Sequence, residues 1–195
     1  MRWEVCLCAV IPRLETRTRI VLLMHYRETK ATTNTGRLAT LALPHSEIRV
    51  RGEKGRPLDW EGILVPSRQP LFLYPDDDAE LLTEDFVRSL RWPVTLIVPD
   101  GTWRQAAKVG KREAALKDVP RIKLPAAISE YRLRKSHGAG VSTIEAIAGA
   151  LGVLEGPEVE TALRTLFHLM VDRTLATRSP PAIAARGGLI AQPRI

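Results

Sequence analysis

The chain has 195 residues, 45% of them hydrophobic and 26% charged, which suits a folded domain with a sizeable core and excludes wholesale disorder. No apolar run approaches the roughly 20 residues that span a bilayer, and the N-terminus lacks the layout of a cleavable signal peptide. We therefore expect a cytoplasmic protein with no membrane contact. Its 29 lysines and arginines exceed its 22 acids, giving a net charge of +7.

The first half of the chain alternates strand-like and helix-like segments. Residues 18–24 form a nearly continuous apolar run, which is typical of a buried parallel strand. A short helix is predicted over 36–43, where Pro44 stops it, and acids at 76–78 favour the start of a helix over 79–90. Further strands are predicted at 47–51, 63–65 and 71–74.

The second half continues the same alternation. The clearest central strand is predicted at 94–98, followed by a helix beginning near Thr102 and a short strand at 121–124. Two helices, 142–151 and 159–175, close the fold. This alternation, without an internal repeat, predicts one α/β domain over residues 1–176 with a mostly parallel sheet flanked by helices. Residues 177–195 contain Pro and Gly without strong periodicity and are predicted to form a loose extension.

The positive charge is concentrated in one segment. Between Arg104 and Lys135 ten basic residues face three acids, so this stretch alone carries a charge of +7 and the rest of the chain is neutral. Such a concentration indicates a polyanionic partner, most simply a nucleic acid. A solvated basic face would give the same count.

A metal site is not expected from the residues. Cys6 and Cys8 are too few for a disulfide scaffold or a four-cysteine zinc site. His25 with Glu28 has the spacing of a metal pair, but no third ligand lies at a suitable distance in the sequence.

The strongest candidate site follows the predicted strand at 94–98, because ligands of open α/β sheets bind beyond the carboxyl ends of strands. A carboxylate, Asp100, and an aromatic ring, Trp103, stand between this strand and its helix. Thr102 with Gln105 fits a capping box, which would explain Thr102 but neither Asp100 nor Trp103. On a continuous helix Arg104, Lys108, Lys111 and Arg112 would share one face beside this acid and ring.

Two further segments are candidates. A glycine-bearing loop leads into a helix at Ser142, where backbone N–H groups could hold a carboxylate or phosphate, although Ser142 and Glu145 also form a capping box. The segment from His25 to Arg37 follows the first strand, and either Asn34 or Thr35 is expected to cap the next helix.

These residues carry a family resemblance. Asp100-Gly101-Thr102-Trp103 resembles the D-x-T-W signature of the DTW-domain family, the tRNA-uridine aminocarboxypropyltransferases. Supporting blocks occur in order from about Cys6 to about Leu175: Cys6–Cys8, Arg17–His25, Thr33–Ala39, Tyr131–Arg134 and Ser142–Ala146. Five ordered blocks over most of the chain make the resemblance specific.

The resemblance implies a SPOUT-like fold with a C-terminal trefoil knot that binds S-adenosylmethionine as co-substrate. It implies transfer of the 3-amino-3-carboxypropyl group to N3 of a tRNA uridine, with methylthioadenosine as by-product. Family members commonly carry an additional cysteine pair before the C-x-C motif that could help to bind zinc. Nothing upstream of Cys6 supplies that pair here, so we do not expect zinc.

Residue roles follow from combining the resemblance with the motifs. Asp100 is the expected catalytic residue, either as the base for the uridine N3–H or as the group that orients the amino end of the donor. Trp103 would form an apolar wall that tolerates the sulfonium cation. The full set expected to bind the donor is Asp100, Thr102, Trp103, Leu124, Ser142, Thr143, Glu145, His25, Asn34 and Thr35. The set expected to bind RNA phosphates is Arg104, Lys108, Lys111, Arg112, Arg132, Arg134 and Lys135.

Two other functions fit the same sequence. A SPOUT-type RNA methyltransferase would use the same donor, and a non-catalytic RNA-binding module would need only the basic segment. The sequence carries no signal for an interface, so both a monomer and the dimer that is frequent among related knotted enzymes stay open.

Overall fold

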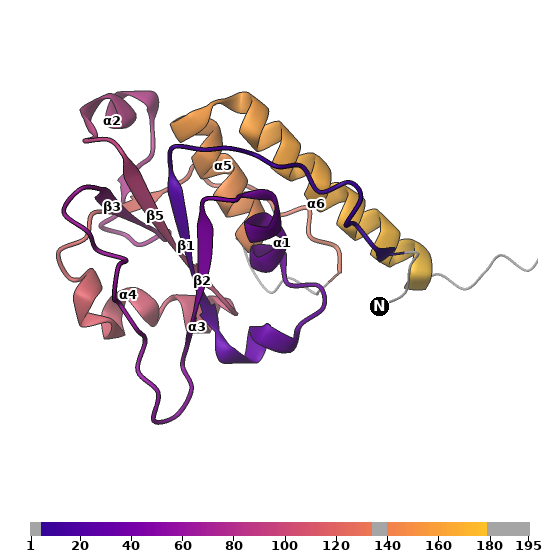
Figure 1. The fold of residues 1–195 in the computed structure, drawn as a ribbon, viewed down its shortest axis with the longest axis horizontal. Coiled ribbons are helices and arrows are strands. Elements are labelled where there is room, and N and C mark those ends of the chain that lie inside the picture. Colours follow the sequence, from indigo (N-terminus) through magenta and orange to yellow (C-terminus); the bar gives the residue numbers. More distant parts are fainter. Residues whose placement is uncertain (1–4, 134–139, 179–195) are drawn as a thin grey trace, which may run out of the picture.

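In the computed structural model, residues 5–133 and 140–178 are described. Six parallel strands form one sheet in the order β2-β1-β5-β3-β6-β4 (Figure 1). Their bounds are β1 (Arg19–His25), β2 (Ser46–Arg51), β3 (Gln69–Leu73), β4 (Glu80–Leu81), β5 (Val94–Asp100) and β6 (Arg121–Lys123). The predicted mostly parallel sheet flanked by helices is confirmed.

The two faces of the sheet bury different layers. On β1, Ile20, Leu22 and Met24 join one core with α1 (Thr35–Ala42), α5 (Thr143–Glu155) and α6 (Pro157–Arg178). Val21 and Leu23 join the opposite core, beneath α4 (Val109–Arg112) and the 3₁₀ helix η3 (Ala114–Leu116). Every residue of β5 is buried, as expected of a strand covered on both faces.

The remaining short helices lie at the ends of strands. The 3₁₀ helix η2 (Tyr26–Lys30) follows β1, and α3 (Trp103–Ala106) follows β5. The helix α2 (Glu84–Ser89) and the helix α3 lie at opposite ends of the strands (Figure 1). No helix within the described ranges combines the length and apolarity that crossing a membrane requires.

The connections leaving β1 and β5 create a crevice. These strands are neighbours, and Met24 pairs with Asp100 near their carboxyl ends. The chain leaves β1 through α1 toward β2, whereas it leaves β5 through α3 and α4 toward β6, on the other side of the sheet. Adjacent strands whose connections diverge in this way form the switch point at which open α/β sheets bind ligands.

Three predicted elements are wrong in detail. Residues 63–65 form no strand: Ile63 belongs to a turn, where its N–H donates to the carbonyl of Trp60, and it enters the second core from there. The predicted helix 79–90 begins only at Glu84, because Glu80 and Leu81 pair with β6. The helix from 102 divides into α3 and α4.

The C-terminal helices agree more closely with the prediction. The helix α5 covers 143–155, and α6 runs from Pro157 to Arg178, two residues into the extension predicted for 177–195. Residues 179–195 lie outside the described ranges, as do residues 134–139 in the connection from β6 to α5. The trefoil knot and the SPOUT-like class therefore stay predictions.

Candidate functional site

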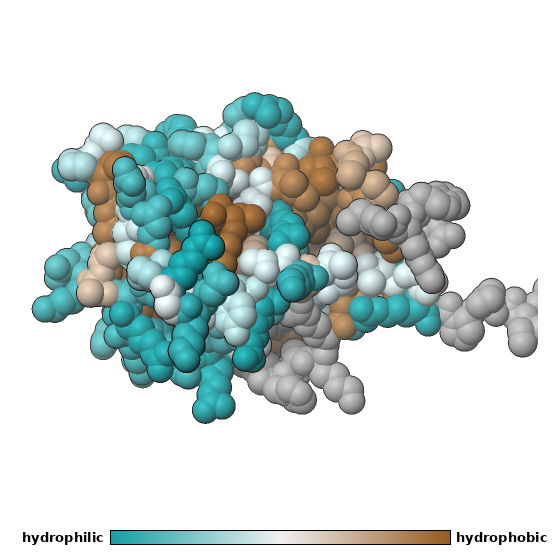
Figure 2. Space-filling view, turned by 60° about the horizontal axis from the view of Figure 1, so that its bottom comes forward, coloured by the Kyte–Doolittle hydropathy of each residue, from teal (hydrophilic) through white to brown (hydrophobic). Residues whose placement is uncertain are grey.

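A cavity of about 760 Å³ opens at the carboxyl ends of β3, β5 and β6. This is within the usual volume of small-molecule sites. Figure 2 brings this edge of the molecule forward and shows apolar side chains among a largely hydrophilic surface. The lining segments include 33–35, 73–75, 98–104, 123–127 and 140–143. Thus α1 and α5 begin at the same cavity in which β5 ends.

Asp100 is a fixed, buried carboxylate in the wall of this cavity. It is only 4% exposed. Its Oδ2 accepts a hydrogen bond from Asn34 Nδ2 at 2.8 Å, and its Oδ1 accepts one from Thr143 Oγ1 at 2.6 Å. The N-cap of α1 and the first residue of α5 therefore orient one acid at the end of β5.

The same two helices supply a favourable field for a negative charge. Asn34 is the N-cap of α1, where its Oδ1 accepts from the Arg37 N–H at 2.7 Å, and Thr143 is the first residue of α5. Helix N-termini stabilise nearby anions. The approach of α1 also requires Gly36, because a Cβ there would lie 2.9 Å from Asp100 Oδ1.

Trp103 forms an exposed wall of the cavity. The turn before it is held by the predicted capping box, in which the Thr102 N–H donates to Gln105 Oε1 at 2.8 Å and Thr102 Oγ1 accepts from the Gln105 N–H at 3.3 Å. The indole is 43% exposed, with the Tyr74 ring 6.3 Å away between centroids. Its other neighbour is Gly140, where a Cβ would fall 1.9 Å from the indole Cζ2.

The start of α5 is held by the predicted capping box. The Ser142 N–H donates to Glu145 Oε2 at 2.7 Å, which is one half of that box. Burial raises the pKa of Glu145, but hydrogen bonds from Ser142, Ser129 and the Glu130 N–H outweigh it and lower that pKa. Glu145 does not line the cavity and instead fastens residues 129–130 to α5.

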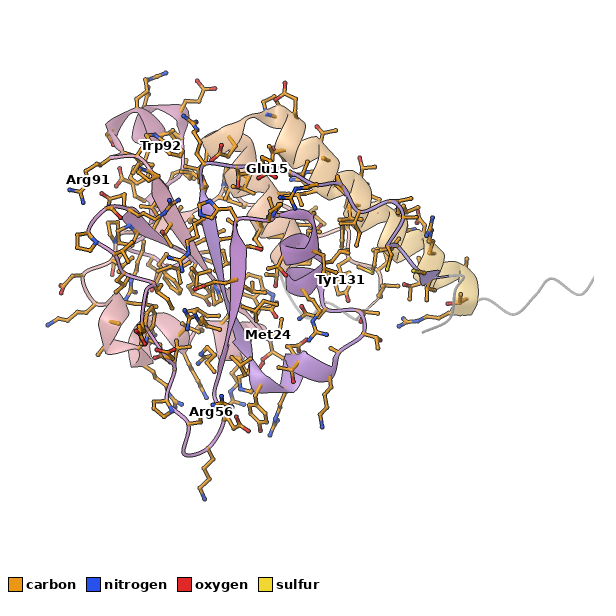
Figure 3. All side chains as sticks on the ribbon, viewed as in Figure 1. Glu15, Met24, Arg56, Arg91, Trp92 and Tyr131 are labelled. Carbon is orange, nitrogen blue, oxygen red and sulfur yellow. The ribbon has the colours of Figure 1, made fainter. Side chains whose placement is uncertain are left out.

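Two residues of this site were missed from the sequence. Glu28, in η2, lines the cavity, is 9% exposed and accepts from Asn34 Nδ2 at 3.3 Å. Tyr131 also lines it, and its hydroxyl donates to the Thr33 carbonyl at 2.8 Å (Figure 3). The signal for Glu28 was its position just after β1, beside the strand that ends in Asp100.

His25 is not among the residues that line the cavity. Its Nδ1 accepts from the Arg27 N–H at 3.3 Å and lies 3.3 Å from Gln105 Nε2. His25 therefore contacts the segment 102–105 from outside the cavity. Burial, followed by the charges of Arg51 and Arg27, lowers the pKa of His25. The expected donor-binding residues Asn34, Thr35, Thr102, Trp103, Leu124, Ser142 and Thr143 all line the cavity with Asp100.

The basic residues do not lie on one continuous helix. Arg104 belongs to α3 and lines the cavity, whereas Lys108, Lys111 and Arg112 are exposed on or beside α4. Arg132 is exposed and pairs with Asp172 at 2.8 Å. Arg134 and Lys135 lie outside the described residues.

The described part of the chain contains no group of three or more His, Cys, Asp or Glu side chains that could hold a metal ion. Cys6 and Cys8 contact each other, and hydrogen bonds from the Cys8 backbone and side chain lower the pKa of Cys6. Within the described residues these two cysteines lack the further ligands that zinc requires.

Sequence comparisons find known relatives of this chain. A DTW domain is matched over residues 1–175. The tRNA-uridine aminocarboxypropyltransferase 2 of Drosophila melanogaster is 34% identical over 85% of this chain and 69% of its own length. The protein of the same name from Macaca fascicularis is 30% identical over 85% of this chain and 59% of its own length. The chain thus spans about 60–70% of these relatives.

A solved structure is similar in fold. The SAM-dependent rRNA:acp-transferase Tsr3 from Vulcanisaeta distributa aligns with a TM-score of 0.53 at 19% identity, covering 82% of this chain and 79% of that one. At this identity the likeness concerns the fold alone.

Proposed function

Because the chain belongs to the DTW domain family, we propose that it transfers the 3-amino-3-carboxypropyl group of S-adenosylmethionine to N3 of a tRNA uridine. In this reaction a bond forms between N3 and the γ-carbon of the donor, and the bond from that carbon to sulfur breaks. The electron pair stays on sulfur, which leaves as methylthioadenosine, and the N3 proton passes to a base. The uridine-specific names of the curated relatives support this choice of acceptor.

The observation that carries the proposal is the buried Asp100 carboxylate, held in a donor-sized cavity by the N-cap of α1 and the first residue of α5. The methionine end of the donor carries an ammonium and a sulfonium, both of which a fixed carboxylate attracts. The same carboxylate can accept the N3 proton. Either role places Asp100 against the reacting groups.

Other residues that line the cavity suit the remaining groups of the donor. The N-terminus of the 13-residue α5 can hold the donor carboxylate. The exposed Trp103 indole offers a face to the sulfonium and its methyl group. Since the sulfonium is already a good leaving group, the choice of γ-carbon over methyl is a matter of positioning.

The acceptor RNA would approach over the exposed cations near the cavity. Arg104 lies on the cavity wall, and Lys108, Lys111 and Arg112 follow it along the chain. Phosphate contacts by such residues make binding fall with salt concentration. Arg132, Arg134 and Lys135 complete the proposed RNA-binding set, and a cytoplasmic location remains our prediction.

The experiment that tests the function is incubation of the protein with S-adenosylmethionine and tRNA, followed by mass spectrometry of the nucleosides and the by-product. We expect an aminocarboxypropyl-uridine and methylthioadenosine in equal amounts. A methylated nucleoside with S-adenosylhomocysteine would instead identify a methyltransferase. Binding of tRNA without binding of the donor would identify a non-catalytic RNA-binding module.

A further inference from the structure

A second cavity, of about 440 Å³, lies beyond the end of β2 and apart from the cavity that contains Asp100. Its walls are the loop after β2 and the segment from α4 to η3. Arg51, the last residue of β2, contributes to the wall although it is only 7% exposed. The lining residues are 51–53, 56–58, 60 and 112–115. Figure 3 labels Arg56 in the loop that follows β2.

Arg51 is a buried cation, and two nitrogens of its guanidinium lack a hydrogen-bond acceptor among the described residues. Its Nε and Nη1 are buried and have no hydrogen-bond partner among the described residues. The carboxylate of Glu113 approaches Nε only to 3.7 Å, beyond hydrogen-bond distance. Burial lowers the pKa of Arg51, the neighbouring Glu113 opposes this effect, and the charge of Arg112 adds a smaller lowering effect. An anion in this cavity would face the exposed part of Arg51 and supply a second counter-charge beside Glu113.

The rest of the lining suits a nucleotide better than a bare anion. Trp60 is half-buried, packs against the second core and contributes to the cavity wall, as does the apolar Leu58. Arg56 and Arg112 add exposed positive charge, and Arg56 is only loosely paired with Glu53 at 3.6 Å. An indole for stacking together with arginines for a phosphate is the usual combination for one nucleotide of a single-stranded segment.

The position of the cavity connects it to the proposed reaction. The helix α3 borders the first cavity through Trp103 and Arg104, and α4, which follows it directly, borders the second through Arg112. Both cavities lie toward the carboxyl ends of the strands, so one RNA strand can extend from one to the other. The exposed Lys108 and Lys111 lie in the intervening segment.

We propose that the second cavity binds a nucleotide of the RNA substrate other than the modified uridine, with its phosphate on Arg51 and Arg112 and its base against Trp60. This proposal rests on the proposed function for the identity of the RNA. It makes the second cavity a determinant of affinity for tRNA and leaves the donor site unaffected.

The test uses tRNA binding, which needs no transfer reaction. In Arg51→Met, fluorescence anisotropy should show about fivefold weaker tRNA binding at moderate salt, and the slope of log K against log salt should fall by about one. Calorimetry should find the affinity for S-adenosylmethionine unchanged. Arg88→Met is the matched control. It replaces an exposed arginine on α2, at the ends of the strands away from α3, and should bind tRNA as the wild type does.

Two further measurements keep the test decisive should Arg51→Met not fold. The exposed substitution Arg112→Ala should weaken tRNA binding to a similar extent, and tRNA carrying 4-thiouridine should crosslink to the peptide that contains Trp60. Wild-type tRNA affinity in both substituted proteins, or no crosslink to that peptide, would overturn the proposal. So would tighter binding of uridine 5′-monophosphate than of tRNA at this cavity, which would identify a site for a free nucleotide.

The outcomes separate this inference from the proposed function. If tRNA binds through Arg51 and Trp60 but no group is transferred, only the proposed function fails. If transfer occurs and Arg51→Met retains the wild-type KM for tRNA, only the second cavity loses its role.

Discussion

Asn34 and Asp100 lie 66 positions apart in the sequence, and a 2.8 Å hydrogen bond from Asn34 Nδ2 to Asp100 Oδ2 joins them. The same Asn34 side chain caps α1 through its Oδ1. One amide therefore fixes both the start of a helix and the orientation of the acid at the end of β5. The backbone approach at Gly36 leaves little room for any other arrangement.

Substitutions of Asn34 can separate these two tasks. Asn34→Ser keeps a good capping residue but removes the amide donor to Asp100, whereas Asn34→Ala removes both. We expect both proteins to lose affinity for S-adenosylmethionine by about tenfold, since a lost charged hydrogen bond is worth about 1.5–3 kcal/mol. Urea denaturation should find Asn34→Ala less stable than Asn34→Ser by about 1 kcal/mol. Wild-type donor affinity in Asn34→Ser would contradict the orienting role of the amide.

Asp100 itself should be indispensable for transfer. Asp100→Ala is expected to reduce turnover at least about 100-fold, the usual scale of a lost acid–base group, while circular dichroism shows a folded protein. Asp100→Asn retains the shape of the side chain and serves as the matched variant. An unchanged donor affinity in Asp100→Asn with lost turnover would indicate the base, whereas a parallel loss of affinity would indicate the group that holds the donor ammonium. Near-normal turnover in Asp100→Ala would remove this residue from the mechanism.

Trp103 and Gly140 should act on the donor together. Trp103→Ala removes the indole wall and is expected to weaken binding of S-adenosylmethionine by about tenfold in calorimetry. Gly140→Ala places a methyl group 1.9 Å from the indole Cζ2, so the ring must move and affinity should fall as well. Leu41→Ala, an exposed substitution on α1, provides the control and should bind the donor normally. A Gly140→Ala protein with full affinity would show that the position of the ring does not matter.

Glu145 should make the stability of the folded protein depend on pH in the acidic range. Although burial raises its pKa, hydrogen bonds from Ser142, Ser129 and the Glu130 N–H lower it below the ordinary value of 4.5. A depressed folded-state pKa gives stability that is present above 4.5 and is lost as the pH falls through the folded-state pKa. Glu145→Gln should therefore be less stable at pH 7 and show a smaller loss of stability below pH 4.5 in urea titrations. Parallel pH profiles of the two proteins would exclude this contribution.

The sequence predicted those parts of the site that lie within one local segment. The strand and turn that present Asp100 and Trp103, and both capping boxes, could be read from short-range pattern and residue type. The resemblance to a known family then predicted that these segments form one site. Asn34 was identified as one of two alternatives for a helix cap and as an expected donor-binding residue, but its bond to Asp100 depends on which strands are neighbours.

The errors have the same physical origin. Ile63 belongs to a short apolar run that packs into a core from a turn, and such a run cannot be distinguished from a strand by pattern alone. The break between α3 and α4 is not marked by Pro, so the basic residues there appeared to share one face. Glu28 and Arg51 acquire their importance from burial, which depends on tertiary packing.

The most direct measurement is a crystal structure of the protein with S-adenosylmethionine bound. We predict density in the 760 Å³ cavity, with the amino group of the donor beside Asp100, its carboxylate at the start of α5 and its sulfonium against Trp103. The γ-carbon should face the opening through which a uridine can enter. Donor density at the Arg51 cavity, or a methyl group facing that opening in place of the γ-carbon, would contradict the account.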